Sequence, residues 1–249
     1  MKKILAVIVI MLFVTMTGIA QANDFVNGGF ESGDFTGWTG GGGSWYSGAA
    51  PINPTTYNGG TPNNSIMSGG TDPYTGANRV YNGSYSLRAN DNYNNYSVST
   101  IRQSVSNYTE NNIYFAWNAV LQGSHGLYDS DYFSLTLRDD TYSTDVVSRA
   151  YSSAGPIGAG TSGVTWTNYS GVYSSNWVVE NIDVEGLGLL GHDFTLTLLA
   201  SDCPYSGHWG YAYLDGFGAA PPVQSAPEPA TMLLLGLGLV GLATLRRKF

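Results

Sequence analysis

The chain has 249 residues, of which only 11% are charged, whereas glycine contributes 33 residues and tyrosine 18. Residues 23–226 contain five arginines, no lysine and 17 acidic residues, which gives this central part a net formal charge of −12. Such a surface repels nucleic acid and anionic lipid, so the composition excludes a nucleic-acid partner.

The first 22 residues have the pattern of a secretory signal peptide, which would be helical. Lys2 and Lys3 form a positive region, residues 4–13 form an apolar region, and residues 20–22 (Ala-Gln-Ala) form a small-x-small cleavage site. The pattern predicts export and cleavage before Asn23. An uncleaved N-terminal membrane anchor is the alternative.

Residues 23–218 suit a single exported domain with a substantial core. Alternation of apolar and polar residues with a period of two predicts half-buried antiparallel strands in four segments, namely 84–88, 112–121, 132–138 and 193–199. No segment shows an apolar stripe of helical period. We therefore predict an all-β, antiparallel β-sandwich, in which the similar FSLTL and FTLTL segments are two strands of one domain.

Clusters of glycine and asparagine separate the predicted strands. Residues 40–43, 58–60, 69–70 and 155–163 are expected to be loops by turn chemistry. Residues 40–78 carry almost no strand signal. They predict a long polar loop region, which is either an ordered loop that carries function or a mobile insertion.

Residues capable of catalysis form no recognisable motif. His125, His192 and His208 lie in unrelated, loop-like segments, and neither a Gly-x-Ser-x-Gly nor a His-Glu-x-x-His sequence is present. We expect no catalytic residue, although a glycoside hydrolase needs only two suitably spaced carboxylates. Cys203 is the only cysteine; burial is favoured over pairing with another chain.

Several aromatic residues are candidates for a sugar-binding surface. Trp45 and Tyr46 follow a glycine run, and Trp177 follows Ser-Ser-Asn, so exposed rings are expected there. An exposed aromatic ring offers a flat apolar face and, in tyrosine, a hydrogen-bonding tip. Trp38 and Trp117 lie in strand-like contexts and are expected in the core.

The two ends of this domain resemble a known fold family. The opening NGGFESGDFTGW (residues 27–38) and the closing GHWGYAYLD (residues 207–215) are similar to those of galactose-binding-like jelly rolls, which include bacterial carbohydrate-binding modules. The resemblance implies a jelly roll with a structural calcium ion, whose ligands would be Glu31 and Asp215. Calcium prefers such oxygen ligands. In the alternative reading, Glu31 caps a turn and Asp215 faces solvent.

A linker at residues 219–226 leads to a distinct C-terminal segment, residues 227–249. It begins with Pro227, Glu228 and Pro229, continues with an apolar run at residues 230–245, and ends in a basic stop. The basic residues are Arg246, Arg247 and Lys248. As a helix the run spans roughly 24 Å, which is short for a permanent anchor. We predict a single transmembrane helix that holds the chain transiently, with its basic end in the cytoplasm.

This order of tripeptide, apolar span and basic stop resembles the PEP-CTERM sorting signal. The resemblance implies a bacterium that makes exopolysaccharide and processing by a membrane-embedded exosortase. The mature protein would reach the cell surface or the extracellular matrix of a biofilm. The combined features predict a non-catalytic protein that binds exopolysaccharide; a structural matrix protein without a sugar site and a polysaccharide hydrolase are the alternatives.

Overall fold

The computed structural model describes residues 24–47, 50, 52–126, 128–154, 164–205 and 207–224. The predicted signal peptide, the sorting tripeptide, the apolar run and the basic stop lie outside the described residues. Within the described ranges, no helix has both the length and the apolar character needed to cross a membrane.

The described residues form twelve β-strands and one short 3-10 helix. In chain order they are β1 (Thr39–Ser44), η1 (Pro54–Tyr57), β2 (Ser65–Ser68), β3 (Tyr85–Ala89), β4 (Ser97–Val105), β5 (Asn112–Gln122), β6 (Tyr132–Asp139), β7 (Thr144–Ser152), β8 (Thr167–Tyr169), β9 (Val172–Ser174), β10 (Val178–Asp183), β11 (Phe194–Ser201) and β12 (Gly210–Gly218).

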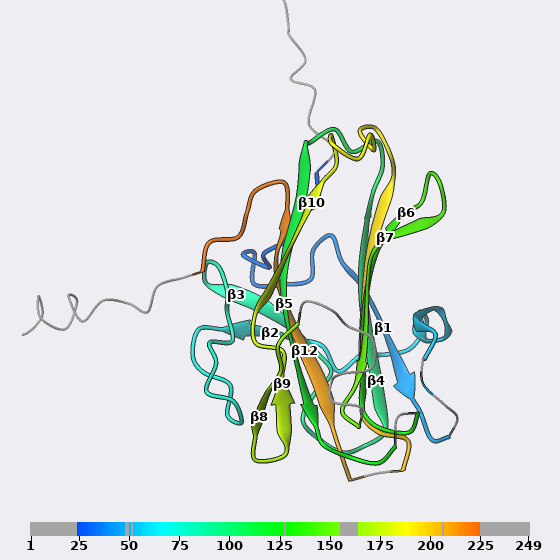
Figure 1. Ribbon diagram of the computed structural model, residues 1–249, viewed down its shortest axis with the longest axis vertical. Helices are drawn as coiled ribbons and strands as arrows, with labels where there is room; N and C mark the ends of the chain where they lie inside the picture. The colour runs from blue at the N-terminus through cyan, green and yellow to red at the C-terminus, as the bar shows by residue number, and fades with distance from the viewer. Residues whose placement is uncertain are drawn as a thin grey trace, which may run out of the picture.

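The strands form two sheets, which Figure 1 shows as two layers. One sheet has the order β1-β4-β11-β6-β7, and the other has the order β2-β3-β12-β5-β9-β8, with β10 paired to the first half of β5. Consecutive strands from β3 to β6 alternate between the layers, and β12, the last strand, pairs with β3. These are the connections of a jelly roll, so the predicted all-β antiparallel sandwich is confirmed.

The core lies between the two layers and contains the residues that the alternation placed inward. Ile113, Phe115, Trp117 and Ala119 of β5 are all fully buried in it. From the opposite sheet, Phe133 stacks on Trp117, with 4.9 Å between the ring centroids. All four predicted strand segments are strands, and the two similar segments are the hydrogen-bonded neighbours β6 and β11.

The glycine run at residues 40–43 is not a loop, and this prediction is wrong. It is part of β1, an edge strand that pairs with β4. The chain after η1 crosses closely over it: a Cβ atom at Gly41 would lie 2.1 Å from the carbonyl oxygen of Tyr57, and one at Gly42 would lie 2.4 Å from that of Thr61. Glycine is required here for close approach of two backbones rather than for turning.

The described residues of the region 40–78 include β1, η1 and β2, so this part of the chain is not one long loop. Part of it covers the outer face of the seven-stranded sheet. Asp72, which is 2% exposed, accepts hydrogen bonds from the hydroxyls of Tyr211 (2.5 Å) and Tyr213 (2.8 Å) on β12. This loop therefore covers the part of the outer face of the seven-stranded sheet that β12 forms.

Candidate functional site

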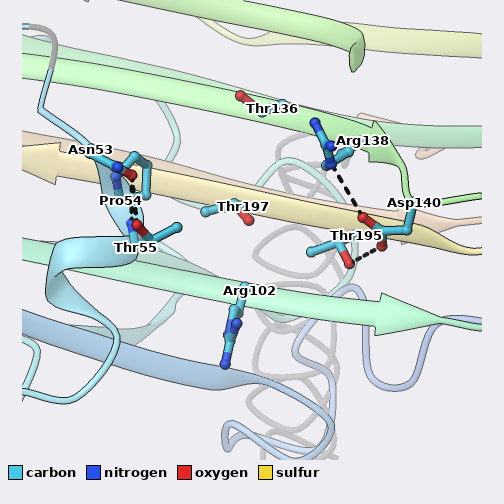
Figure 2. A pocket seen from close by; sticks show the side chains of 9 residues that line it. All are labelled: Asn53, Pro54, Thr55, Arg102, Thr136, Arg138, Asp140, Thr195 and Thr197. Atoms are coloured by element: carbon cyan, nitrogen blue, oxygen red, sulfur yellow. Dashed lines mark hydrogen bonds and ion pairs between the residues drawn. The ribbon is translucent and has the colours of Figure 1, made fainter. Parts of the chain in front are cut away.

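A groove of about 460 Å³ lies on the outer face of the five-stranded sheet (Figure 2). Its floor comes from β4, β11 and β6, and η1 and the residue before it form one wall. The lining residues are Asn53, Pro54, Thr55, Arg102, Thr136, Arg138, Asp140, Thr195 and Thr197.

Strand register places the polar side chains of the floor in a row across three strands. Thr197 of β11 lies opposite Arg102 of β4 on one side and opposite Thr136 of β6 on the other. Their strand neighbours, such as Leu196 and Leu137, point into the core. With strands about 4.8 Å apart, the row is roughly 10 Å long, and it presents a guanidinium and two hydroxyls to solvent.

A second row of polar side chains lies beside the first, and its members form hydrogen bonds and ion pairs with their neighbours. Thr195 is opposite both Ser104 and Arg138. Its Oγ1 donates to Asp140 Oδ2 at 2.6 Å, and Arg138 forms ion pairs with Asp140 at 3.5 Å and with Asp145 at 3.4 Å. The charge of Arg138 is therefore balanced by neighbouring carboxylates.

Arg102 differs from Arg138, since its guanidinium has no hydrogen-bond or ion-pair partner among the described residues. The side chain is exposed and comes from the middle of β4. Unpaired and held on β4, which has a neighbouring strand on each side, it is the basic group of the groove that is free to bind an anion.

The wall formed by η1 is held in shape by its own cap. Asn53 Oδ1 accepts hydrogen bonds from the amide nitrogen of Thr55 at 3.0 Å and from its hydroxyl at 2.9 Å. Pro54 occupies the first helical position, where the missing amide proton costs nothing. The wall therefore does not depend on a ligand for its conformation.

The three aromatic residues that the sequence suggested as sugar platforms do not form one site. Trp45 is only 5% exposed and packs with Val98 and Leu199, so the expectation of an exposed ring is wrong. Ala50 and Ile52, which follow β1 in the sequence, are buried in the same cluster as the indole. Trp38 and Trp117 are buried, as predicted.

Tyr46 and Trp177 lie on opposite sides of the sandwich. Tyr46 is 66% exposed, and its ring lies 5.0 Å from that of Tyr96. Trp177 is half-buried against Tyr213 on the other sheet, and its indole nitrogen donates to the carbonyl oxygen of Asn78 at 2.8 Å. Of the three, Tyr46 alone presents a largely open ring.

Glu31 and Asp215, the predicted calcium ligands, lie next to each other. A Cβ atom at Gly29 would be 3.6 Å from Asp215 Oδ1 and 3.7 Å from Glu31 Cγ, so both side chains flank this glycine. The Glu31 carboxylate accepts hydrogen bonds from the backbone amides of Ser84 and Tyr85.

Asp215 is fully buried, so the alternative in which it faces solvent is wrong. Its Oδ2 accepts hydrogen bonds from the amides of Tyr81 and Asn82, but its Oδ1 is buried without a partner. Burial, and to a lesser extent the charge of Glu31, raises the pKa of Asp215 to about 7. The unpartnered Oδ1 of Asp215 and the neighbouring carboxylate of Glu31 are oxygen donors of the kind that calcium prefers.

His125 and His208 lie in separate loops, as the sequence indicates, but the structure brings these two loops together. His125 and His208 lie beside Cys203, and the three possible ligand atoms are within 4.8 Å of one another. They meet because β5 and β12 are hydrogen-bonded neighbours, which brings the segment after β5 to the loop before β12. Cys203 is fully buried, as favoured.

The C-terminal segment matches a known family model. Residues 225–248 match the PEP-CTERM protein-sorting motif. This motif is that of an exported protein that is processed at the cell envelope, and it implies processing by an exosortase. Among curated proteins, none matches this sequence.

Several solved structures are similar to the chain in fold. TmCBM61, described in complex with β-1,4-galactotriose, is 13% identical over 79% of this chain and 97% of its own, with a TM-score of 0.40. Caldicellulosiruptor saccharolyticus CBM27-1, described in complex with mannohexaose, is 11% identical over 82% and 100%, with a TM-score of 0.38. CBM28, described as specific for non-crystalline cellulose, is 15% identical over 77% and 92%, with a TM-score of 0.39. These similarities concern the sandwich and assign no ligand.

Proposed function

We propose that the exported protein binds an acidic polysaccharide in the groove of the five-stranded sheet and catalyses no reaction. The observation that carries this proposal is the unpaired guanidinium of Arg102 in a row with the hydroxyls of Thr197 and Thr136. A planar guanidinium pairs bidentately with a carboxylate. The hydroxyls offer donors and acceptors to the neighbouring sugar hydroxyls.

The charge distribution supports an acidic ligand at this place. Only five arginines offset 17 acidic residues between residues 23 and 226, and two of the five line the groove. A polyanion is repelled by most of the surface, so Arg102 provides both the attraction and the position. Binding is expected to weaken as salt is added.

A non-catalytic role is supported by the lining itself. Asp140 is the single carboxylate in it, and this group is engaged by Arg138 and Thr195. Hydrolysis of a glycosidic bond uses a pair of carboxyl groups on opposite sides of the bond, and the groove does not supply one.

The sorting motif supports a location where such a polymer is met. We propose that the processed protein resides at the cell surface or in the extracellular matrix and that its ligand is the exopolysaccharide there. We also propose that Glu31 and Asp215 hold a structural calcium ion, supported by the unsatisfied Oδ1 of Asp215.

Polygalacturonic acid and its methyl ester test the groove, because esterification removes the carboxylates and leaves the sugar. The full-length chain, purified in mild detergent, is expected to bind the acid and to bind the ester more weakly. Arg102→Ala is expected to lower the affinity for the acid about tenfold or more, since a hydrogen bond to a charged group contributes about 1.5–3 kcal/mol. Affinity electrophoresis measures the change.

Arg79→Ala is the charge-matched control, since Arg79 lies outside the groove and its guanidinium donates to the carbonyl oxygen of Gly69. Equal binding by the Arg102→Ala and Arg79→Ala variants would contradict the proposal, as would failure to bind acidic polymers of several backbones. Calcium-dependent self-association without polymer binding, seen by light scattering, would instead support a structural matrix protein.

A further inference from the structure

One end of the sandwich gathers the single cysteine of the chain and two of its three histidines. Cys203 and His208 lie at the two ends of the loop between β11 and β12, and His125 lies in the segment between β5 and β6. The rings of His125 and His208 are nearly perpendicular, with 4.9 Å between their centroids. Neither the proposed polysaccharide groove nor the Glu31–Asp215 pair uses these residues.

The spacing of the ligand atoms suits a bound transition metal. Cys203 Sγ lies 3.7 Å from His208 Nδ1. Zinc–sulfur and zinc–nitrogen bonds of about 2.3 and 2.05 Å at a tetrahedral angle place the two ligand atoms about 3.6 Å apart. The third ligand, His125, lies within 4.8 Å of both and is exposed, so its side chain can close the remaining distance by a small rotation.

The backbone fixes this arrangement in the absence of an ion. The amide of Cys203 donates to the carbonyl oxygen of His208 at 3.2 Å, which closes the loop on itself. The amide of Gln122 donates to the carbonyl oxygen of Trp209 at 3.1 Å, which joins the end of β5 to the residue after His208. Ligands from two separate segments are therefore held together by hydrogen bonds beside them.

We propose that His125, Cys203 and His208 bind a transition-metal ion, with zinc as the expected occupant. Thiolate and imidazole are ligands that zinc prefers, whereas calcium and magnesium prefer oxygen. Binding requires the thiolate, so the thiol proton of Cys203 passes to solvent as the metal–sulfur bond forms.

Three protein ligands leave a fourth tetrahedral position for water or for another ligand. The ion enters from the side of His125, since Cys203 itself is fully buried. Once bound, it joins the β11–β12 loop to the β5–β6 segment and keeps the only thiol of the chain from oxidation or pairing.

Cobalt is the probe, because a cobalt–thiolate bond gives visible ligand-field bands and a near-ultraviolet charge-transfer band. The untagged full-length chain, reduced and stripped of metal, is titrated with cobalt and then with zinc. We expect one cobalt ion per chain, both sets of bands, and their loss when zinc displaces cobalt. Zinc is also expected to slow alkylation of Cys203.

His125→Ala is the decisive variant, since this exposed side chain contributes little to the core. It is expected to weaken zinc binding by at least about tenfold, because loss of outer-shell partners alone costs 10–100-fold. Cys203→Ser is expected to abolish the charge-transfer band. The control is His192→Gln, whose Nδ1 pairs with Asp139 at 3.0 Å, away from the cluster; it should bind zinc as the unmodified chain does.

Two results would overturn the proposal. One is a cobalt spectrum without a thiolate charge-transfer band in the unmodified chain. The other is unchanged zinc affinity and unchanged protection of the thiol in His125→Ala. Calcium added in place of cobalt should leave alkylation of Cys203 unaffected, which separates this site from the Glu31–Asp215 pair.

Discussion

At the scale of single residues, the unusual feature is a set of buried carboxyl groups without a basic partner in the described part of the chain. They are Asp131, Asp202 and Asp215, each at most 1% exposed. Burial raises the pKa of all three. Asp202 at the end of β11 is also the best bonded, since it accepts from Asn90 Nδ2 and from the amides of Asn95 and Ser97.

The raised pKa of Asp202 predicts that the protein loses stability as the pH rises. Its pKa is raised from 3.8, the ordinary value of an aspartate side chain, to about 7 in the folded protein, so the folded state keeps a proton that the unfolded chain releases between these values. The free energy of unfolding therefore falls from about pH 4 to pH 7. A shift of this size corresponds to about 4 kcal/mol at most, or a melting temperature lower by about 10 °C.

Melting curves measured by circular dichroism between pH 4.5 and pH 8 test this expectation. Asp202→Asn, which does not titrate, should make the dependence on pH shallower whatever its own melting temperature. The decline that remains is expected from Asp131 and Asp215. An equally steep dependence in the variant would show that Asp202 is not responsible.

At the scale of elements, the strands that the sequence predicts are those with one buried and one polar face. β3, β6 and β11 show this alternation, and β5 shows it only in its first residues, since Phe115–Leu121 are all buried. β12 does not, because its outward residues Tyr211 and Tyr213 are covered by the loop that carries Asp72. All its residues from Gly210 to Asp215 are buried, and a continuously buried run lacks the period of two.

The polysaccharide groove and the cluster of His125 and Cys203 were less predictable than the strands, since each depends on which strands become neighbours. Arg102 lies in line with Thr136 because β11 lies between β4 and β6 and is paired with both. His125 meets Cys203 because β12 pairs with β5. Neither pairing joins strands that are adjacent in sequence. The pair Glu31 and Asp215 was found because its motif is carried by two short segments that a family resemblance had already linked.

The edge strand β1 gives a prediction of its own. Gly41→Ala places a methyl group 2.1 Å from the carbonyl oxygen of Tyr57, and backbone must move to relieve this contact. Overpacking of this kind costs about 1–3 kcal/mol, so the melting temperature should fall by about 3–10 °C. Gly59→Ala is the matched control, since a Cβ atom there has no neighbour within 4 Å. Equal melting of the two variants would contradict the account of β1.

At the scale of the whole molecule, the start and the end of the described chain meet. The ring of Phe25 lies 3.7 Å from that of Phe217, and the amide of Phe217 donates to the carbonyl oxygen of Gly28 at 3.1 Å. Glu31 and Asp215 lie where this first segment contacts β12. An ion between them would join the first segment of the domain to its last strand.

Calcium is therefore expected to stabilise the entire sandwich. At a concentration about 100 times the dissociation constant, the gain is about 2.7 kcal/mol, or about 5–10 °C in melting temperature. Calorimetry with a chelator and after addition of calcium measures it. The Asp215→Asn variant should have the same melting temperature with the chelator as with calcium. Magnesium should stabilise the unmodified chain less than calcium does. A calcium effect that persists in this variant would place the ion elsewhere.

The position of β12 also determines when the domain can fold. It is the last strand of the described residues, yet it lies between β3 and β5 in the middle of its sheet. The seven-stranded sheet can therefore be completed only once the chain as far as Gly218 is available, because β3 and β5 have no other strand between them until β12 pairs with both.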